Sequence, residues 1–360
     1  MDASFHAPGR ANLIGEHTDH TDGLVLPAAI DRGVTLAGEL GGGRIVLTSD
    51  AVDEAVDVAA DGSEMPTSGF GRFVAAVAAE LDAAGRERVG LTGHLTSDLP
   101  QGAGLSSSAA LEVVVATALC EAATFELPPV EVAALCRRAE HRAVGVPSGI
   151  MDQAASVLGR ADHAVLLDCA TLAYETVPMP AGHALLIMDT GVRRQLESSG
   201  YGQRTEELEA ALPVLAGRRP AEVDPRELPG LLAQLSDVPA RRLRHVVTEN
   251  ARVLATVDAF RADDRDRIGA LFAEGHASLR DDFEVSVAEL DAMVEIAVEA
   301  GATAARMTGG GFGGAAIALV VEGRLQEIAG VVEDQYRRRF PEREPALYRC
   351  IAAEGARRLA

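Results

Sequence analysis

The pattern of apolar and polar residues changes near residue 180. Before that point, short apolar runs and stretches that alternate with a period of two predict several β-strands between helices. Beyond it, apolar positions recur mostly every three to four residues, which predicts a run of amphipathic helices. We therefore expect two domains, comprising residues 1–180 and 181–360.

Turn residues and helix-ending residues delimit the expected elements. We expect strands near residue 5, within 33–58 on both sides of a Gly41–Gly43 turn, and at 89–95, 163–169, 184–189, 302–307, 315–321 and 347–352. We expect helices at 70–84, 109–120, 130–142, 203–212, 226–235, 240–261, 265–278, 287–299 and 325–340. Pro8 and Gly9 predict a turn after the first strand, and residues 190–201 are expected to form a polar connection.

A loop rich in glycine and serine leads into the expected helix at 109–120. It runs from Leu99 to Leu111 and reads Leu-Pro-Gln-Gly-Ala-Gly-Leu-Ser-Ser-Ser-Ala-Ala-Leu. Gly102 and Gly104 let the backbone approach a ligand closely, and the unpaired N–H groups at a helix start favour a phosphate. The chain contains no lysine, so this is not a Walker A loop. Backbone amides, arginine and a metal ion must therefore meet the phosphate charge.

Ionisable side chains crowd the segment between Ile14 and Gly23. They are Glu16, His17, Asp19, His20 and Asp22. Three interpretations are open: a zinc site, a solvated acidic surface loop, or a loop that binds the hydroxyl groups of a polyol such as a sugar. The segment lacks the helical His-Glu-x-x-His spacing of a zinc site, which favours the other two.

Two carboxylates come from one segment further along the chain. Asp152 lies in the first turn of a short expected helix, where a carboxylate also serves simply as a partner of the helix N-terminus. Glu140 lies near the end of the preceding helix at 130–142. This segment therefore delivers two carboxylates that could share one site.

A second glycine-rich stretch, Thr308-Gly-Gly-Gly-Phe-Gly-Gly314, separates the expected strands at 302–307 and 315–321. A hairpin loop alone would favour glycine here. Five glycines in six positions exceed that need and suit a backbone that approaches a ligand or another loop closely.

Composition narrows the range of partners. The 360 residues carry a formal net charge of −21, which disfavours nucleic acid and anionic membranes as partners, because both require a basic face. The four cysteines, at positions 120, 136, 169 and 350, have no Cys-x-x-Cys spacing and are expected to be reduced, buried thiols. The sequence shows no signal-peptide pattern and no apolar run long enough to span a membrane, so a cytoplasmic protein is expected.

Three separated stretches resemble the motifs of the GHMP small-molecule kinases. They are Gly9-Arg-Ala-Asn-Leu-Ile-Gly-Glu-His-Thr-Asp19 with Gly23-Leu-Val-Leu-Pro27, the loop at 99–110, and the stretch at 308–314. The first stretch looks like that of the galactokinases within this superfamily. The resemblance implies an α+β fold of two domains with the active site between them. An N-terminal mixed-sheet domain would hold the phosphate loop, and the C-terminal domain would be an α/β sandwich of ferredoxin-like type.

The resemblance also implies a reaction and a set of site residues. The reaction is phosphorylation of galactose by ATP at the anomeric C1 hydroxyl, carried out with Mg²⁺ by a monomer in galactose catabolism, the Leloir pathway. The implied galactose ligands are Glu16, His17, Thr18, Asp19 and Tyr201. The implied ligands of the ATP phosphates are Gly102, Ala103, Gly104, Leu105, Ser106, Ser107 and Ser108, and those of Mg²⁺ are Ser108 and Glu140. Asp152 would be the catalytic base, with Arg10 as the cation beside it.

These implied roles agree with the chemistry of the side chains. Phosphoryl transfer needs alignment and charge neutralisation more than covalent catalysis. One serine and one glutamate are sufficient hard ligands for a Mg²⁺ ion that also binds phosphate. An arginine within a few ångströms would keep Asp152 ionised and stabilise developing charge. We therefore expect Arg10 and Asp152 to be neighbours.

The chain departs from the family pattern in three places. His20 stands where a tyrosine is common, and Thr21 and Asp22 stand where an asparagine often is. These changes bear on which sugar is selected rather than on the kinase class. Gly9 and Arg10 also follow almost directly on the start of the sequence, where family members usually have a longer segment. Two explanations are open: the first strand is frayed, or the start of the sequence is misassigned.

Two alternative functions remain open at this stage. One is a kinase for another sugar, such as N-acetylgalactosamine or arabinose, because small pocket changes alter discrimination by only a few kcal/mol. The other is a non-catalytic sensor that binds galactose and ATP. The base, the metal ligands and the serine loop that a sensor could lose are all present, which favours an enzyme.

Overall fold

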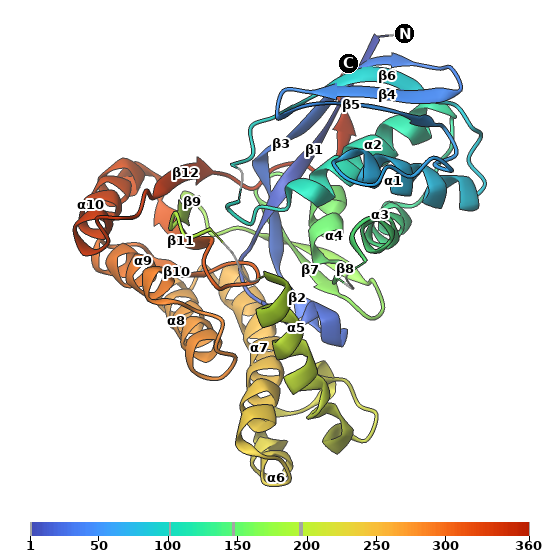
Figure 1. Cartoon of the computed structure of the whole chain (residues 1–360). Coiled ribbons are helices and arrows are strands. Elements are labelled where there is room, and N and C mark those ends of the chain that lie inside the picture. The colour runs from blue at the N-terminus through green and yellow to red at the C-terminus, as the bar shows by residue number, and fades with distance from the viewer. Residues whose placement is uncertain (1, 101, 146–147, 194–196, 360) are drawn as a thin grey trace.

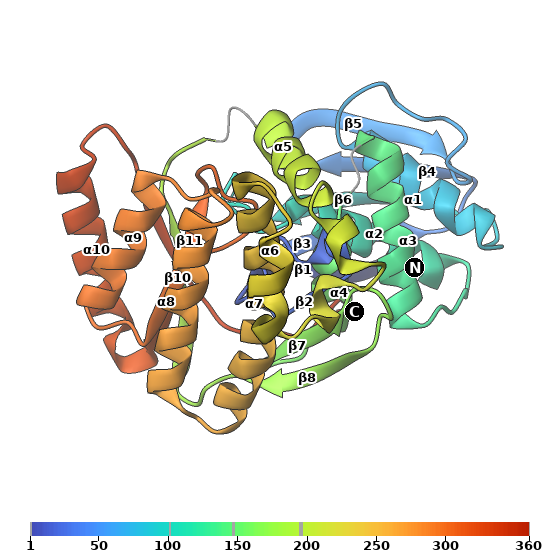
Figure 2. The same ribbon diagram turned by 90° about the horizontal axis from the view of Figure 1, so that it is seen from below.

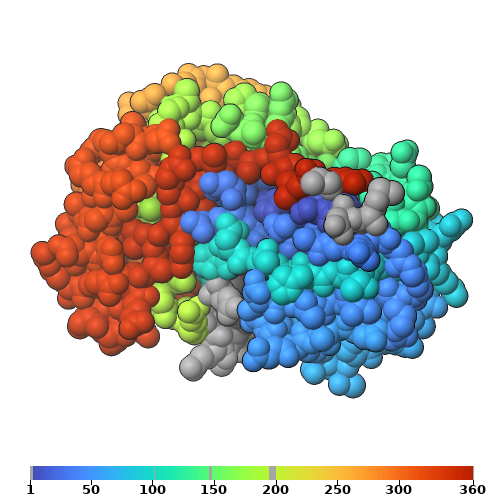
Figure 3. Space-filling model, turned by 90° about the horizontal axis from the view of Figure 1, so that it is seen from above, coloured from blue at the N-terminus to red at the C-terminus, as the bar shows by residue number. Residues whose placement is uncertain are grey.

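A computed structural model describes residues 2–100, 102–145, 148–193 and 197–359 of the chain (Figure 1). The N-terminal half forms one lobe of sheet and helices, and most of the C-terminal half forms a second lobe beside it. Figure 3 shows these two lobes, blue and orange-red, meeting along the face seen from above.

A six-stranded sheet forms the centre of the first lobe. Its strand order is β13-β1-β3-β6-β4-β5, and all neighbours are antiparallel except β4 and β6. The strands are β1 (Asp2–Asn12), β3 (Pro27–Leu40), β4 (Arg44–Ser49), β5 (Val52–Ala59), β6 (Leu91–Ser97) and β13 (Arg357–Arg358). The helices that cover it are α1 (Gly71–Ala83), α2 (Ser107–Ala122), α3 (Pro129–Val144) and α4 (Met151–Leu158). Their apolar faces share one core with the sheet.

A three-stranded antiparallel sheet lies against the same helices. Its order is β2 (Leu24–Val25), β7 (His163–Asp168) and β8 (Tyr174–Pro178). The sequence pattern did not predict β8, because most of its side chains are polar or exposed. A strand with only one buried position carries almost no periodic signal.

The second lobe is built on a four-stranded antiparallel sheet. One face of this sheet packs in a core of its own, and the other face belongs to the core of the first lobe. The strand order is β10 (Ala304–Met307), β11 (Ala315–Val321), β9 (His183–Asp189) and β12 (Ala346–Cys350). Its helices are α5 (Glu197–Glu209), α6 (Leu228–Leu232), α7 (Asp237–Arg261), α8 (Arg265–Asp281), α9 (Ala288–Glu299) and α10 (Leu325–Arg339). Figure 2 shows α8, α9 and α10 side by side along this lobe. The layered arrangement agrees with the expected α/β sandwich.

The predicted turn at Pro8 and Gly9 is wrong. The first strand continues through both residues, and its register with β3 shifts between Pro8 and Arg10, which marks a β-bulge. The expected fraying is also wrong, because β1 pairs with β3 on one side and with β13 on the other.

Two further expectations are corrected near the lobe boundary and at the end of the chain. Helix α5 begins at Glu197, so part of the predicted connection 190–201 is helical. The last strand, β13, pairs with β1, and Ala352 bridges Ile30, so the end of the predicted second domain joins the first sheet. Apolar periodicity cannot reveal such a return, because β13 is short and exposed.

All four cysteines are unpaired; three are buried, and Cys120 is partly buried. Over the described residues, every helix is either too short or too polar to cross a membrane.

The bulge in β1 places Gly9 against the glycine- and serine-rich loop. The Arg10 amide donates a hydrogen bond to the Leu105 carbonyl at 3.2 Å, so the strand and the loop are joined through their backbones. A Cβ on Gly9 would lie only 2.6 Å from the Leu105 carbonyl oxygen. The strand can therefore approach the loop this closely only because residue 9 has no side chain.

We expect Gly9→Ala to lower the free energy of unfolding by about 1 to 3 kcal/mol, the usual cost of overpacking. Gly43→Ala is the matched control, since a Cβ there would meet nothing within 4 Å, and it should change stability by less than about 0.5 kcal/mol. Urea unfolding followed by circular dichroism measures both variants. Equal stability of the two would show that the strand and loop are not closely packed.

Candidate active site

A cleft of about 340 Å³ lies between the glycine- and serine-rich loop and the hairpin loop of β10 and β11. It is lined by Arg10, Pro100, Gly102, Gly104, Leu105, Ser106, Ser107, Ser108, Asp152, Gly309 and Gly310. Two glycine-rich stretches that are far apart in the sequence thus meet at one cavity. The second stretch is a hairpin loop, as its pairing requires, and it also lines the cleft.

The backbone of the first loop turns sharply before α2. Gly102 and Gly104 have φ angles of 78° and 70°, and Ser106 has 60°. A left-handed serine is strained and marks a position that the surrounding contacts hold in place. Ala103 and Leu105 are buried and anchor the loop, and its glycines and serines line the cleft. Gln101 lies outside the described residues.

An arginine that the sequence analysis left without a role lies directly over this loop. A Cβ on Gly102 would be 2.3 Å from Nη1 of Arg193, which follows β9 in the second lobe. Arg193 therefore brings positive charge to a loop that contains no lysine. The signal in the sequence was weak, since Arg193 is one of 33 arginines and lies in a stretch without periodicity.

Arg10 and Asp152 are neighbours, as expected. Arg10 Nε donates to Asp152 Oδ1 at 2.8 Å, and its Nη1 donates to the Gly104 carbonyl at 2.6 Å. Ser106 Oγ donates to the other oxygen of Asp152 at 2.5 Å. The carboxylate is held at both oxygens yet remains 31% exposed, on the wall of the cleft. Because carboxylate oxygens have two lone pairs each, it can still accept a proton.

Ser108 and Glu140 also face one another. Ser108 Oγ donates to Glu140 Oε1 at 3.1 Å, and Ser148 Oγ donates to Glu140 Oε2 at 2.6 Å. Such hard oxygens fit Mg²⁺ together with phosphate oxygens. No group of three or more His, Cys, Asp or Glu that could hold a metal ion exists in the described parts of the chain, so the zinc interpretation of 14–23 gains no support.

A buried acid beneath this pair was missed. Glu112 of α2 is fully buried, and Gln153 Nε2 donates both to Glu112 at 3.0 Å and to Glu140 at 3.1 Å. Burial, together with the charges of Glu140 and Asp152, raises the pKa of Glu112 to about 9. Glu112 is therefore neutral at pH 7. It could have been noticed as the one charged residue within the apolar run at 109–120.

The segment 14–23 is not a solvated loop, because most of it is buried. Glu16 is 1% exposed, and His17 is buried with a positive φ of 61°. Burial, followed by the charges of His20 and His245, lowers the pKa of His17 well below its usual range, so its ring is neutral. Its Nε2 has no hydrogen-bond partner. Buried polar atoms without partners are unusual in a folded protein, so this segment is suited to binding polar groups of a ligand.

Thr18 and Asp19 of this segment differ in the groups that they can present to a ligand. The Thr18 hydroxyl lies 2.8 Å from the Gly15 carbonyl and 2.7 Å from the Leu24 carbonyl, which favours a role in shaping the loop over the predicted contact with sugar. Asp19 packs against Gly149, where a Cβ would lie 1.7 Å from its Oδ2. Burial alone would raise the pKa of Asp19, but hydrogen bonds and charge from His20 outweigh it and hold the pKa below its usual value.

Tyr201 of α5 joins this loop from the second lobe. Its hydroxyl lies 3.5 Å from His20 Nδ1, and its ring centroid lies 5.5 Å from that of His17. Phe283 also packs against His17, with the two ring centroids 4.6 Å apart. Burial, with the charges of Asp19 and Asp152, raises the pKa of Tyr201, so the phenol stays neutral. The sequence gives no sign of this role for Phe283, since a lone phenylalanine after a helix carries no pattern.

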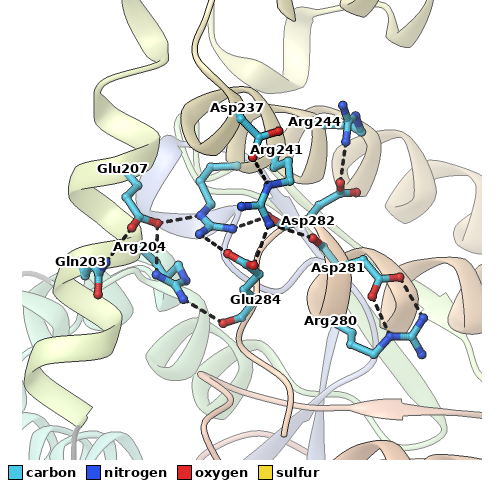
Figure 4. Close-up of polar contacts among 11 residues, drawn as sticks. Gln203, Arg204, Glu207, Asp237, Arg241, Arg244, Arg280, Asp281, Asp282 and Glu284 are labelled. Carbon is cyan, nitrogen blue, oxygen red and sulfur yellow. Dashed lines mark hydrogen bonds and ion pairs between the residues drawn. The ribbon is translucent and has the colours of Figure 1, made fainter.

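An ion network joins α5, α7 and the segment 282–284 that follows α8 (Figure 4). Arg242 of α7 donates to Glu207 of α5 at 2.8 Å, to the Asp282 carbonyl at 2.5 Å and to Glu284 at 2.6 Å. Arg204 of α5 also donates to the Glu284 carbonyl, at 3.1 Å. The network thus fixes α5, which carries Tyr201, and the segment that carries Phe283.

Comparison with known proteins agrees with this geometry. Residues 72–160 match the profile described as GHMP kinases N terminal domain, residues 256–338 match GHMP kinases C terminal, and residues 2–40 match the galactokinase galactose-binding signature. A curated galactokinase of Thermococcus kodakarensis is 41% identical over 336 residues, which cover 93% of this chain and 94% of that protein.

Solved structures show the same relationship. The crystal structure of Lactococcus lactis galactokinase complexed with galactose is 33% identical, with a TM-score of 0.94, and the match covers 99% of this chain and 95% of that one. Mevalonate kinase of Methanococcus jannaschii is only 18% identical, with a TM-score of 0.69 over 98% of both chains, and shares the fold alone.

Fold and kinase-domain profiles together define a two-domain GHMP kinase, which confirms the predicted α+β class. Within that class, this chain belongs to the galactokinase family. It is therefore an ATP-using sugar kinase rather than a non-catalytic sensor.

We expect Arg242→Met to lower the free energy of unfolding by about 2 to 4 kcal/mol, because it leaves acids in the network without their buried partner. Arg244→Met is the matched control: Arg244 lies on the same helix and pairs with Asp282 at 2.8 Å, but its side chain is 44% exposed against 2% for Arg242. Its loss should cost less than about 1 kcal/mol. Thermal unfolding distinguishes the two, and similar losses would refute a special role for Arg242.

Proposed function

We propose that this chain transfers the γ-phosphoryl group of ATP to the C1 hydroxyl of galactose and releases ADP. The observation that carries this proposal is the position of Asp152. Arg10 and Ser106 hold it on the wall of the cleft that the glycine- and serine-rich loop lines. Its charge also raises the pKa of Tyr201, which packs beside the buried segment 14–23. A base between a phosphate loop and a polyol site suits phosphoryl transfer to a sugar hydroxyl.

Each proposed step uses groups that are close enough to act. Asp152 accepts the proton of the C1 hydroxyl as that oxygen forms its bond to the γ-phosphorus. The bond from phosphorus to the bridging oxygen of ADP breaks at the same time, and ADP leaves with that electron pair. Arg10, 2.8 Å from Asp152, and the amides of the loop from Gly102 to Ser108 stabilise the charge on the phosphoryl oxygens. Arg193 adds a second guanidinium beside Gly102.

Ser108 and Glu140 would hold Mg²⁺. The ion would neutralise charge on the ATP phosphates. Gln153 and Ser148 keep the Glu140 carboxylate in place by hydrogen bonds. The nearby Glu112, neutral because of its raised pKa, adds no competing negative charge at pH 7.

We propose that galactose is bound by Glu16, His17, Asp19 and Tyr201, and that Thr18 shapes the loop that presents them. The support is that Glu16 Oε1 and His17 Nε2 are buried without protein partners, while Tyr201 packs beside them. All these groups come from one chain, which suits a monomeric enzyme. We propose that the enzyme acts in the cytoplasm, as part of galactose catabolism, because that compartment supplies ATP.

Release of ADP by the purified protein with galactose, N-acetylgalactosamine, glucose and arabinose tests this function. We expect galactose to give the highest kcat/KM. Preference for another sugar would assign the enzyme a different substrate, and His20, 3.5 Å from the Tyr201 hydroxyl, would then be the first residue to examine. No turnover with any of the sugars would refute the function.

Asp152→Asn is the matched variant for that assay. Because an amide cannot accept the hydroxyl proton, kcat should fall by about a hundred- to ten-thousand-fold. The galactose dissociation constant should change little, since the side chain keeps its size and polarity. Unchanged turnover would show that Asp152 is not the base.

A further inference from the structure

A fully buried arginine connects the second lobe to the segment that holds Glu16. Arg306 lies on β10, and its Nη2 donates to Glu16 Oε2 at 2.5 Å and to Glu249 Oε1 of α7 at 2.8 Å. All three side chains are at most 1% exposed. Three segments that are remote in sequence therefore meet at one guanidinium nitrogen.

The surroundings are adapted to this guanidinium. Gly275 of α8 leaves room for it, because a Cβ there would lie 2.8 Å from Arg306 Nη1. Two residues further along, the Thr308 hydroxyl donates to the Asn12 carbonyl at 2.9 Å and accepts from the Asn12 amide at 3.2 Å. Residues 306 and 308, immediately before the glycine-rich hairpin loop, thus contact both the end of β1 and the segment 14–23 that follows β1.

Glu249 completes the arrangement from the far side. Its Oε1 also accepts from the Gly15 amide at 3.0 Å, and its Oε2 accepts from Arg252 at 2.8 Å. Burial would raise the pKa of Glu249, but Arg306 and Arg252 outweigh it and hold the pKa far below its usual range. Glu249 is therefore ionised, and it orients Arg306 and the backbone of residue 15 together.

Glu16 is held at only one of its two oxygens. Oε2 accepts from Arg306, whereas the buried Oε1 has no partner within hydrogen-bond geometry. Burial raises the pKa of Glu16 to about 7, against the opposing charge of Arg306 and the nearby Asn12 amide. Arg306 therefore fixes one oxygen of the carboxylate and is the main group that favours its charged form.

We propose that Arg306 is a positioning residue for sugar recognition: by holding Glu16 Oε2, it orients the unpaired Oε1 to accept a galactose hydroxyl. This inference rests on the proposed function, because it takes Glu16 as a sugar ligand. Arg306 itself touches no substrate in this arrangement and acts through Glu16. Its removal should therefore weaken sugar binding without altering the use of ATP.

Titration calorimetry with galactose, in the presence of a non-hydrolysable ATP analogue, tests this role. Arg306→Met should raise the galactose dissociation constant by at least about tenfold, the effect of losing one hydrogen bond to a charged group. The KM for ATP should stay within about twofold of the wild-type value. Arg252→Met is the matched control, since Arg252 contacts Glu249 but not Glu16, and it should leave galactose affinity nearly unchanged.

The pH dependence of binding provides a readout that a general loss of packing would not move. Galactose should bind more weakly to the wild type as the pH falls through about 7, because Glu16 becomes protonated there. In Arg306→Met this midpoint should move to higher pH, because the opposing cation is gone. Glu16→Gln should abolish this transition. The other ionisable groups near Glu16 are Glu249, Arg252 and His245 of α7 and His17 of its own loop.

If Arg306→Met does not fold, the double variant Arg306→Met/Glu249→Gln removes the second buried carboxylate with the cation, and the same losses are expected from it. Wild-type galactose affinity with an unmoved midpoint, in either variant, would overturn the role of Arg306. Absence of galactose binding by the wild-type protein would instead refute the proposed function. The two failures are therefore distinguishable.

Discussion

The contact between Arg10 and Asp152 joins the parts of this molecule that must act together. Arg10 lies on β1 just after the bulge, and it reaches both Asp152 of α4, the proposed base, and the carbonyl of Gly104 in the glycine- and serine-rich loop. Gly9 permits this by allowing the strand to approach the loop backbone closely. One side chain thus sets the distance between the proposed base and the phosphate site, while the following residues of the same segment reach the proposed sugar site.

The sequence of this acidic protein contains no lysine, and arginine with its planar, multidentate guanidinium joins several of its elements. Arg10 bridges a carboxylate and a carbonyl, and Arg306 bridges two carboxylates from different elements. Arg242 joins α5 to the segment that carries Phe283. Arg10 and Arg242 each donate through more than one nitrogen, so a lysine ammonium there would offer a single point of charge in place of a fixed fork of donors. Arg306 reaches both of its carboxylates through Nη2 alone. Ion pairs therefore support the aromatic and acidic groups of the proposed sugar site; those of Arg306 are buried, whereas those of Arg242 involve partly exposed carboxylates.

Much of this arrangement could be predicted from the sequence, because it depends on local patterns. Helix and strand periodicity located most elements, and the two glycine-rich stretches marked the cleft they line. The bulge at Pro8 and Gly9 was mistaken for a turn, since both residues favour either feature. The return of β13 to the first sheet, and the partners Arg193, Glu112, Phe283 and Arg306, depend on tertiary contacts that no local period reveals.

Phosphorus NMR of the sugar phosphate formed from ATP and galactose tests the central claim most directly. If the phosphoryl group is transferred to the C1 hydroxyl of galactose, the new phosphomonoester resonance will couple to the anomeric proton of the sugar. Coupling to the methylene protons at C6, or the formation of ADP without any sugar phosphate, would contradict transfer to C1.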